Sequence, residues 1–235
     1  MSAFRLFIGY DAKDYDAVVA AIKSLRRVAP DLEPTLLVEE RLRAAGLFWR
    51  TQDKRSSQGY DLTGNETFST AFKYTRFLTP LLAQEGPAMF VDADVLFYSD
   101  PRELIGPDFL TAAPAVSVVQ HAYTPAESRK MVDQQQTAYL RKNWSSVMLF
   151  NCDHPANRRL SLRDVNERTA WELQSFYWLH DDEIGSLEPG WNWLVDVQPR
   201  PQPMHIAHLT LGGEWLPGWQ GGSFDDEWRA VRDAK

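Results

Sequence analysis

The chain has 235 residues, enough for one sizeable domain with its own hydrophobic core. Hydrophobic residues make up 44% of it and charged residues 24%, a balance that excludes a disordered or fibrous protein. The 25 Lys and Arg against 32 Asp and Glu leave a formal net charge of −7, which argues against nucleic acid as a partner.

The N-terminal residues predict a strand, a helix and a second strand. Residues 4–8 form a short apolar run that ends in Gly9-Tyr10-Asp11, typical of a buried strand entering a loop. Apolar residues at helical spacing then indicate a helix, with Asp14 as its N-cap and Pro30 after its end. Residues 35–38 favour a second strand, so the chain begins with a βαβ unit.

Polar and apolar segments alternate in the middle of the chain. Residues 50–66 are polar and aperiodic, which predicts a long exposed loop, whereas residues 68–82 have the apolar spacing of a helix. Residues 87–91 predict a buried strand that ends at Asp92-Ala93-Asp94. A helical turn near Pro101 and a strand at 115–119 follow, so the order of elements is that of an α/β protein.

Further strands and helices are predicted toward the C-terminus. The polar stretch 121–141 is interpreted as an acceptor-binding or lid region, with His121, Tyr123 and Lys130 in it. Strands are expected at 145–150, 191–195 and 204–208, helices at 155–167 and 168–179, and a polar helix at 221–235. Because the chain has no repeat and no linker, we expect a single domain over residues 1–235.

Cysteine, tryptophan and apolar-run patterns bound the class of protein further. The single cysteine, Cys152, excludes an internal disulfide framework and is interpreted as a small buried hydrophobe. No stretch approaches the roughly 20 apolar residues of a transmembrane segment, and the N-terminal residues lack a secretion pattern, so a cytoplasmic protein is expected. Eight of the nine Trp lie at or after Trp144, which predicts a dense core or a surface for flat ligands.

Asp92 and Asp94 interrupt an apolar run at residues 88–97. In a strand the two carboxylates would point to the same side, about 6.6 Å apart at the backbone, and would repel each other unless a cation neutralises them. Oxygen ligands favour Mg²⁺ or Mn²⁺. Such an ion would bridge the diphosphate of a nucleotide-sugar, or Asp92 would attack a phosphate ester as a nucleophile.

Seven motifs occur in a fixed order along the chain. They are FIGYD at 7–11, YTRFL at 74–78, VDAD at 91–94, NWSSVMLFN at 143–151, DDEI at 181–184, WNW at 191–193 and HIAHLTLGG at 205–213. With them the sequence resembles a bacterial GT-A-type glycosyltransferase and is similar to glycosyltransferase family 8, the glycogenin and lipopolysaccharide galactosyltransferase group. The resemblance covers about residues 4–215.

The resemblance implies a fold and an activity. The fold would be an α/β, Rossmann-like nucleotide-diphospho-sugar transferase domain with a mixed central sheet flanked by helices. Residues 1–98 would bind the nucleotide, residues 99–220 the sugar and acceptor, and residues 221–235 would form a C-terminal helix. The activity would be metal-dependent, retaining hexosyl transfer from a nucleotide-sugar, expected to be a UDP-sugar, to a hydroxyl of a saccharide, lipid or protein acceptor.

Site residues follow from the matched motifs. The metal, Mn²⁺ or Mg²⁺, would be held by Asp92, Asp94 and His208, and the reaction would take place beside Asp181 and Asp182. The nucleotide-sugar would contact the strand ends and the glycine pair, namely Gly9, Tyr10, Asp11, Arg76, Ser146, Asn151, Gly212 and Gly213.

Two departures from the family pattern affect the donor site. The family has a lysine after the metal histidine that steadies the diphosphate, whereas this chain has none there; the candidates to replace it are Lys73, Lys130, Arg141 and Lys142. The acidic motif is Asp-Asp-Glu at 181–183 where the family usually has Asp-Gln-Asp. The missing lysine leaves open a nucleotide-sugar-binding protein without catalysis.

Other interpretations of the same residues stay open, one functional and the others structural. A haloacid-dehalogenase-like phosphatase would explain residues 90–95, with Asp181 and Asp182 as a distal metal pair, but that family places its nucleophile on the first strand. The Gly212-Gly213 pair fits a simple turn. Tryptophans near the proposed sugar site are more in keeping with core or wall positions than with sugar platforms; they are Trp144, Trp191 and Trp193.

Overall fold

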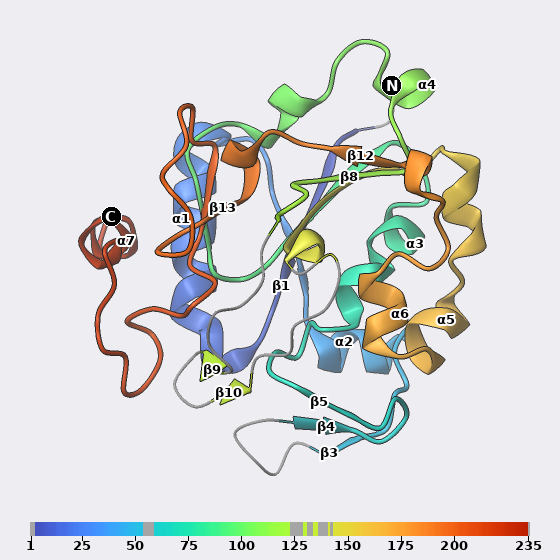
Figure 1. The fold of residues 1–235 in the computed structure, drawn as a ribbon, viewed down its shortest axis with the longest axis horizontal. Helices are drawn as coiled ribbons and strands as arrows, with labels where there is room; N and C mark the ends of the chain where they lie inside the picture. The colour runs from blue at the N-terminus through green and yellow to red at the C-terminus, as the bar shows by residue number, and fades with distance from the viewer. Residues whose placement is uncertain are drawn as a thin grey trace.

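A central six-stranded mixed sheet organises the computed structural model (Figure 1). The structure describes residues 3–53, 59–122, 129–130, 134–135, 141 and 143–234. The sheet has the order β12-β8-β11-β6-β1-β2, and β11 runs antiparallel to β6 and β8 while the other paired strands run parallel. Its strands are β1 (Arg5–Gly9), β2 (Thr35–Leu37), β6 (Pro87–Val91), β8 (Val116–Val118), β11 (Val147–Asn151) and β12 (Ile184–Ser186).

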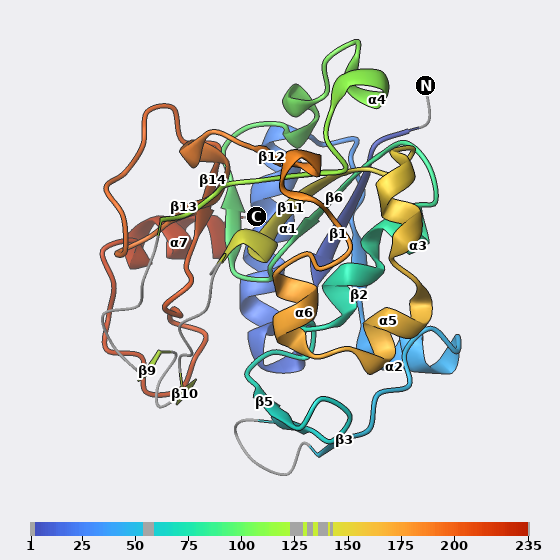
Figure 2. The same ribbon diagram turned by 45° about the vertical axis from the view of Figure 1, so that its right-hand side comes forward.

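Helices cover both faces of this sheet, which explains why its central strands consist mainly of buried apolar residues. Alternate residues of β1 enter different cores, since Leu6 and Ile8 pack on one face and Phe7 on the other. The first face carries α1 (Tyr15–Val28) and α4 (Phe109–Ala112). The second carries α2 (Glu39–Ala44), α3 (Thr79–Ala83), α5 (Leu162–Glu167) and α6 (Ala170–Gln174) (Figure 2). The expected mixed sheet with flanking helices is confirmed.

A second, three-stranded sheet lies beside α1. It has the order β13-β14-β7 and consists of β13 (Trp193–Leu194), β14 (Ile206–His208) and β7 (Val95–Phe97). Leu96, Ala207 and Trp228 join it to the C-terminal helix α7 (Asp225–Arg232) in a third core. Because β7 follows β6 after three residues, the segment Asp92-Ala93-Asp94 connects the two sheets.

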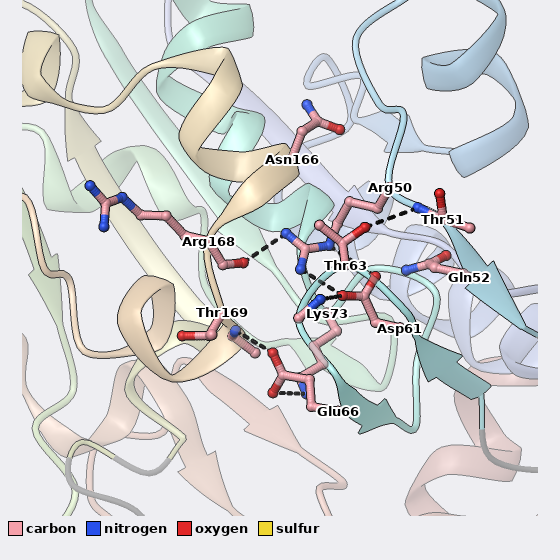
Figure 3. Close-up of polar contacts among 12 residues, drawn as sticks. Arg50, Thr51, Gln52, Asp61, Thr63, Glu66, Lys73, Asn166, Arg168 and Thr169 are labelled. Carbon is pink, nitrogen blue, oxygen red and sulfur yellow. Dashed lines mark hydrogen bonds and ion pairs between the residues drawn. The ribbon is translucent and has the colours of Figure 1, made fainter.

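The prediction of a long exposed loop at 50–66 is wrong for the described residues. Three strands form an antiparallel sheet there, β3 (Gln52–Asp53), β4 (Gly59–Asp61) and β5 (Glu66–Phe68). Arg50 and Asp61 have fully buried side chains joined at 2.6 Å, and the Arg50 guanidinium also donates to the Arg168 carbonyl (Figure 3). It donates to the Val165 carbonyl as well. The polar composition was misleading because these charges are satisfied inside the protein instead of by water.

Several predicted helices are shorter than their patterns indicated. In residues 68–82, Phe68 belongs to β5, and the helical part is a 3₁₀ turn at Thr75–Leu78 followed by α3. The two helices predicted at 155–167 and 168–179 are present as the shorter α5 and α6, which begin after capping boxes at Ser161 and Thr169. The predicted strand at 191–195 is reduced to β13, because Pro189 opens a 3₁₀ turn that includes Asn192.

The other predicted elements are found near their expected positions. They are β1, α1, β2, β6, the turn at Pro101–Leu104, β8, β11, β14 and the C-terminal helix. Most of the predicted acceptor or lid region, including Tyr123, lies outside the described residues, apart from the backbone of the short pair β9 (Arg129–Lys130) and β10 (Gln134–Gln135). Cys152 is buried, as expected. None of the described helices has the length and apolar composition to span a bilayer.

Candidate metal centre

Asp92, Asp94 and His208 meet where the two sheets join. Asp92 follows β6, Asp94 precedes β7, and His208 ends β14, where it pairs with Val95 of β7. One ligand atom of each of the three lies within 4.8 Å of the others. His208 Nε2 is 3.4 Å from Asp94 Oδ1 and 4.0 Å from Asp92 Oδ2. The three residues predicted as metal ligands are therefore brought together from three strands.

The His208 ring presents the nitrogen that a metal ligand needs. Its Nδ1 lies 3.0 Å from Oδ1 of the buried Asn192, which as a carbonyl oxygen accepts the ring proton. The other ring nitrogen, Nε2, faces the two carboxylates and is the atom through which His208 would bind an ion. Sequence analysis placed Asn192 in a motif but gave it no role.

Arg76 is paired with the first carboxylate. Its Nη1 lies 2.9 Å from Asp92 Oδ1 and also donates to the Ser145 carbonyl at 2.8 Å. The Arg76 side chain is buried, with its guanidinium carbon 5.3 Å from the centre of the Phe72 ring and 5.2 Å from that of Phe90. Arg76 was predicted to contact the nucleotide-sugar; in this structure it orients Asp92 and offsets one negative charge.

Asp14 adds a further carboxyl group to this region. It is buried, and Trp215 Nε1 donates to its Oδ1 at 3.0 Å. Burial, and next the charge of Asp94, raise the pKa of Asp14 to about 7. Although Asp14 precedes α1 as predicted, its side chain makes no cap bond. The two carboxylates of Asp92 and Asp94, together with the imidazole of His208, form a donor set that fits Mn²⁺ or Mg²⁺.

Comparison with known proteins places this site in context. No family model matches the chain. Protein CDI of Arabidopsis thaliana is 40% identical over 233 residues, which cover 96% of this chain and 84% of that protein. The chain belongs to the Protein CDI family.

Solved structures of other proteins share the fold of this chain. GlyE of Streptococcus pneumoniae TIGR4 has a TM-score of 0.57 at 13% identity, over 99% of this chain and 62% of GlyE. The bifunctional glycosyltransferase WbbM has a TM-score of 0.57 at 16% identity, over 100% of this chain and 50% of WbbM. The galactosyltransferase LgtC, in complex with donor and acceptor sugar analogues, has a TM-score of 0.52 at 13% identity, over 97% of this chain and 95% of LgtC.

These likenesses confirm the GT-A type of fold and nothing finer. This chain spans only about 62% of GlyE and half of WbbM. The assignment to a bacterial family 8 stays a prediction, and the curated relative is a plant protein.

The predicted nucleotide-binding strand end lies on the same edge of the sheet as Asp92. Ile8 pairs in parallel with Val91, so Gly9 and the residue pair after it emerge beside the metal centre. A Cβ at Gly9 would meet the Phe72 ring at 2.6 Å, which explains the glycine. The Asp11 carboxylate accepts from the backbone N–H groups at positions 13 and 71, so it ties this loop together, and Tyr10 is half-buried.

The prediction of Asn151 as a donor-sugar residue does not fit its position. Because β11 runs antiparallel to β6, Val147 pairs with Val91 at the site edge while Asn151 pairs with Pro87 at the opposite edge. The buried Asn151 amide donates instead to the carbonyls of Leu110 and Ala113. Ser146, by contrast, lies at the site, since its carbonyl accepts from Asp92 N.

The glycine pair has a packing reason. Gly212 has φ +110°, and a Cβ at Gly213 would lie 1.9 Å from the ring of Trp215, the residue that bonds Asp14. This turn begins directly after His208, and Leu209 N donates to the Asp94 carbonyl. The pair is thus explained as a turn beside the metal centre, and its contact with phosphate stays a prediction.

The predicted catalytic pair is outside the cluster of ligands. Asp181 and Asp182 are exposed in a 3₁₀ turn before β12, and Asp181 pairs with Arg141 at 2.6 Å. Arg141 lies 5.5 Å over the ring of Trp144, next to the segment that contains Ser146. The acidic turn is therefore connected to the site through Arg141, while its catalytic role stays a prediction.

The candidates for the missing lysine are placed as follows. Lys73 is paired with Glu66 at 3.0 Å, and Arg141 with Asp181. The side chains of Lys130 and Lys142 lie outside the described residues. Both described candidates therefore already pair with carboxylates other than those of the metal centre.

His121 is a neighbour of the centre to which sequence analysis gave no specific role. It follows β8 at the site edge of the sheet, is buried, and pairs through Nδ1 with Gln198 at 3.2 Å. Burial, followed by the charge of His208, lowers the pKa of His121 to about 4, so the ring is neutral at pH 7. A neutral imidazole here adds polarity without charge.

Proposed function

We propose that this protein is a metal-dependent glycosyltransferase that transfers a sugar from a nucleotide-sugar, a UDP-sugar by resemblance, to a hydroxyl acceptor. The observation that carries the proposal is the cluster of Asp92, Asp94 and His208 at the carboxyl edge of a sheet with the GT-A fold. In open α/β sheets ligands bind at this edge. The proposed retention of anomeric configuration rests on the sequence resemblance.

The residues around the cluster have separable roles in this proposal. Asp92, Asp94 and His208 would hold Mn²⁺ or Mg²⁺, which when bound supplies positive charge for a departing nucleoside diphosphate. Arg76 keeps the Asp92 carboxylate oriented through the 2.9 Å ion pair. His208 bonds Asn192 through Nδ1, so its Nε2 faces the two carboxylates and is available as a ligand.

Two other functions were open on sequence grounds. The phosphatase loses support because Asp92 follows the third strand of a parallel set in a GT-A fold, and not the first strand of the chain. A binding protein without catalysis remains as the competing outcome, since no described lysine replaces the one missing after His208.

The test is Mn²⁺-dependent turnover of a panel of UDP-sugars, followed with and without saccharide acceptors. Asp94→Asn should lower turnover roughly 100-fold or more, because metal stabilisation of leaving-group charge contributes several kcal/mol. Asp226→Asn is the matched control, since Asp226 is exposed on α7. Tight Mn²⁺-dependent UDP binding without turnover would favour the binding protein, and turnover unchanged in Asp94→Asn would refute the metal site.

A further inference from the structure

We propose that Asn192 is a positioning residue of the metal centre. It fixes which nitrogen of His208 carries the proton, and it ties His208 to the segment that holds Asp92. This inference rests on the proposed metal site. Asn192 contacts His208, one of the proposed metal ligands, and would not itself bind the ion.

The hydrogen bonds of Asn192 determine the orientation of its amide. The side chain is fully buried, with Nδ2 donating to Ser146 Oγ at 2.9 Å and to the Asn143 carbonyl at 3.3 Å. A carbonyl oxygen only accepts, so the atom that faces Asn143 has to be the amide nitrogen. The amide oxygen therefore faces His208 Nδ1, and a ring nitrogen bonded to a carbonyl oxygen has to carry the proton.

The surrounding chain holds Asn192 rigidly in this place. Pro189 opens the 3₁₀ turn that ends at Asn192, and β13 continues directly from it, parallel to the strand of His208. The neighbouring Trp191 is buried and stacks on His205 at 4.2 Å with a 7° angle between the rings. The three hydrogen bonds of the amide, to Asn143, Ser146 and His208, determine which way it faces.

Asn192 also links ligands that come from different sheets. His208 belongs to β14 of the second sheet, whereas Asp92 follows β6 of the central sheet. Ser146 accepts from Asn192 through Oγ and from Asp92 N through its carbonyl at 2.9 Å. This series of hydrogen bonds, from His208 through Asn192 and Ser146 to Asp92, therefore couples the position of the imidazole to that of the carboxylate across the sheet junction.

Second-shell partners of metal-bound histidines typically contribute 10- to 100-fold to metal affinity. Asn192→Leu removes the acceptor at similar size, so we expect the Mn²⁺ dissociation constant, measured by electron paramagnetic resonance, to rise by roughly 10- to 100-fold. Asn192→Asp keeps an acceptor for His208 Nδ1, so it should bind Mn²⁺ more tightly than Asn192→Leu. The control is Asn166→Leu, since Asn166 is equally buried but bonds the Leu47 and Leu162 carbonyls.

A second measurement needs no metal. In ¹⁵N-histidine NMR spectra of the metal-free protein, recorded at a pH at which the His208 ring is neutral, the ring proton should lie on Nδ1 in the wild type and in Asn166→Leu. In Asn192→Leu the Nε2–H tautomer should be populated. An Nε2–H tautomer in the wild type, or equal Mn²⁺ affinities in Asn192→Leu and the wild type, would overturn the inference. Mn²⁺ binding without sugar transfer would instead contradict the proposed function alone and leave the role of Asn192 standing.

Discussion

At the residue scale, the carboxyl of Asp14 is held in an environment that disfavours its charge. Burial and the charges of Asp94 and Asp11 raise its pKa to about 7, against the lowering effect of Lys13 and the Trp215 hydrogen bond. Between pH 4 and 7 the native protein therefore keeps a proton that the unfolded chain has lost. The resulting stability is fully present below pH 4 and is lost as the pH rises through 7.

Asp14→Asn should remove this pH dependence, because the amide cannot ionise while its oxygen still accepts from Trp215. At pH 4 the variant and the wild type should have nearly equal free energies of unfolding. At pH 8 the variant should be more stable than the wild type by on the order of 2–4 kcal/mol. Urea unfolding with EDTA across this range measures the difference, and one that stayed constant with pH would contradict the assignment. Added Mn²⁺ should reduce it by neutralising Asp94.

Residues of the site differed in how well the sequence predicted them. Asp92 and Asp94 were predictable because two carboxylates at alternate positions in an apolar run need a cation. Asn151 was misplaced because its position depends on the direction of β11 relative to β6, which the residues of one strand do not specify. Asn192 was missed because its role arises from a contact with His208 across the sheet junction.

At the element scale, the ion pair of Arg50 and Asp61 attaches the β3–β5 sheet to the body of the protein. The guanidinium bonds two carbonyls near α5 and lies 3.8 Å over the ring of Tyr74. Glu66 Oε1 likewise accepts from Ala170 N at the start of α6. The contacts with Val165, Arg168 and Ala170 come from residues more than 100 positions away, so the polar pattern of 50–66 could not distinguish them from contacts with water.

Arg50→Met should destabilise the protein by about 3–5 kcal/mol, because it leaves the Asp61 carboxylate buried without its partner. The double variant Arg50→Met/Asp61→Leu should recover part of this loss, since no buried charge remains. Urea unfolding measures both. Arg163→Met is the matched control, because the Arg163–Glu167 pair is exposed to solvent and its loss should leave the stability almost unchanged. Equal losses in the single and double variants would show that packing alone explains the effect.

At the scale of the whole molecule, the order of elements was predictable and their lateral arrangement was not. The βαβ start and the apolar strands at 87–91 and 115–119 followed from hydrophobic periodicity. The second sheet was missed as a unit, because its strands β7, β13 and β14 have only two or three residues each. Its assembly depends on packing against α1 and α7, which places Asp94 and His208 beside Asp92.

Because the ligands come from both sheets, metal binding should stabilise the molecule as a whole. A ligand that binds only the folded state raises the free energy of unfolding by about 2.7 kcal/mol at 100 times its dissociation constant. Mn²⁺ should therefore raise the melting temperature of the wild type, EDTA should reverse the rise, and UDP should add to it only when Mn²⁺ is present. Asp94→Asn should abolish the response while Asp226→Asn keeps it. A rise of the same size in Asp94→Asn would place the ion elsewhere, because the proposed site would have lost one of its two carboxylates.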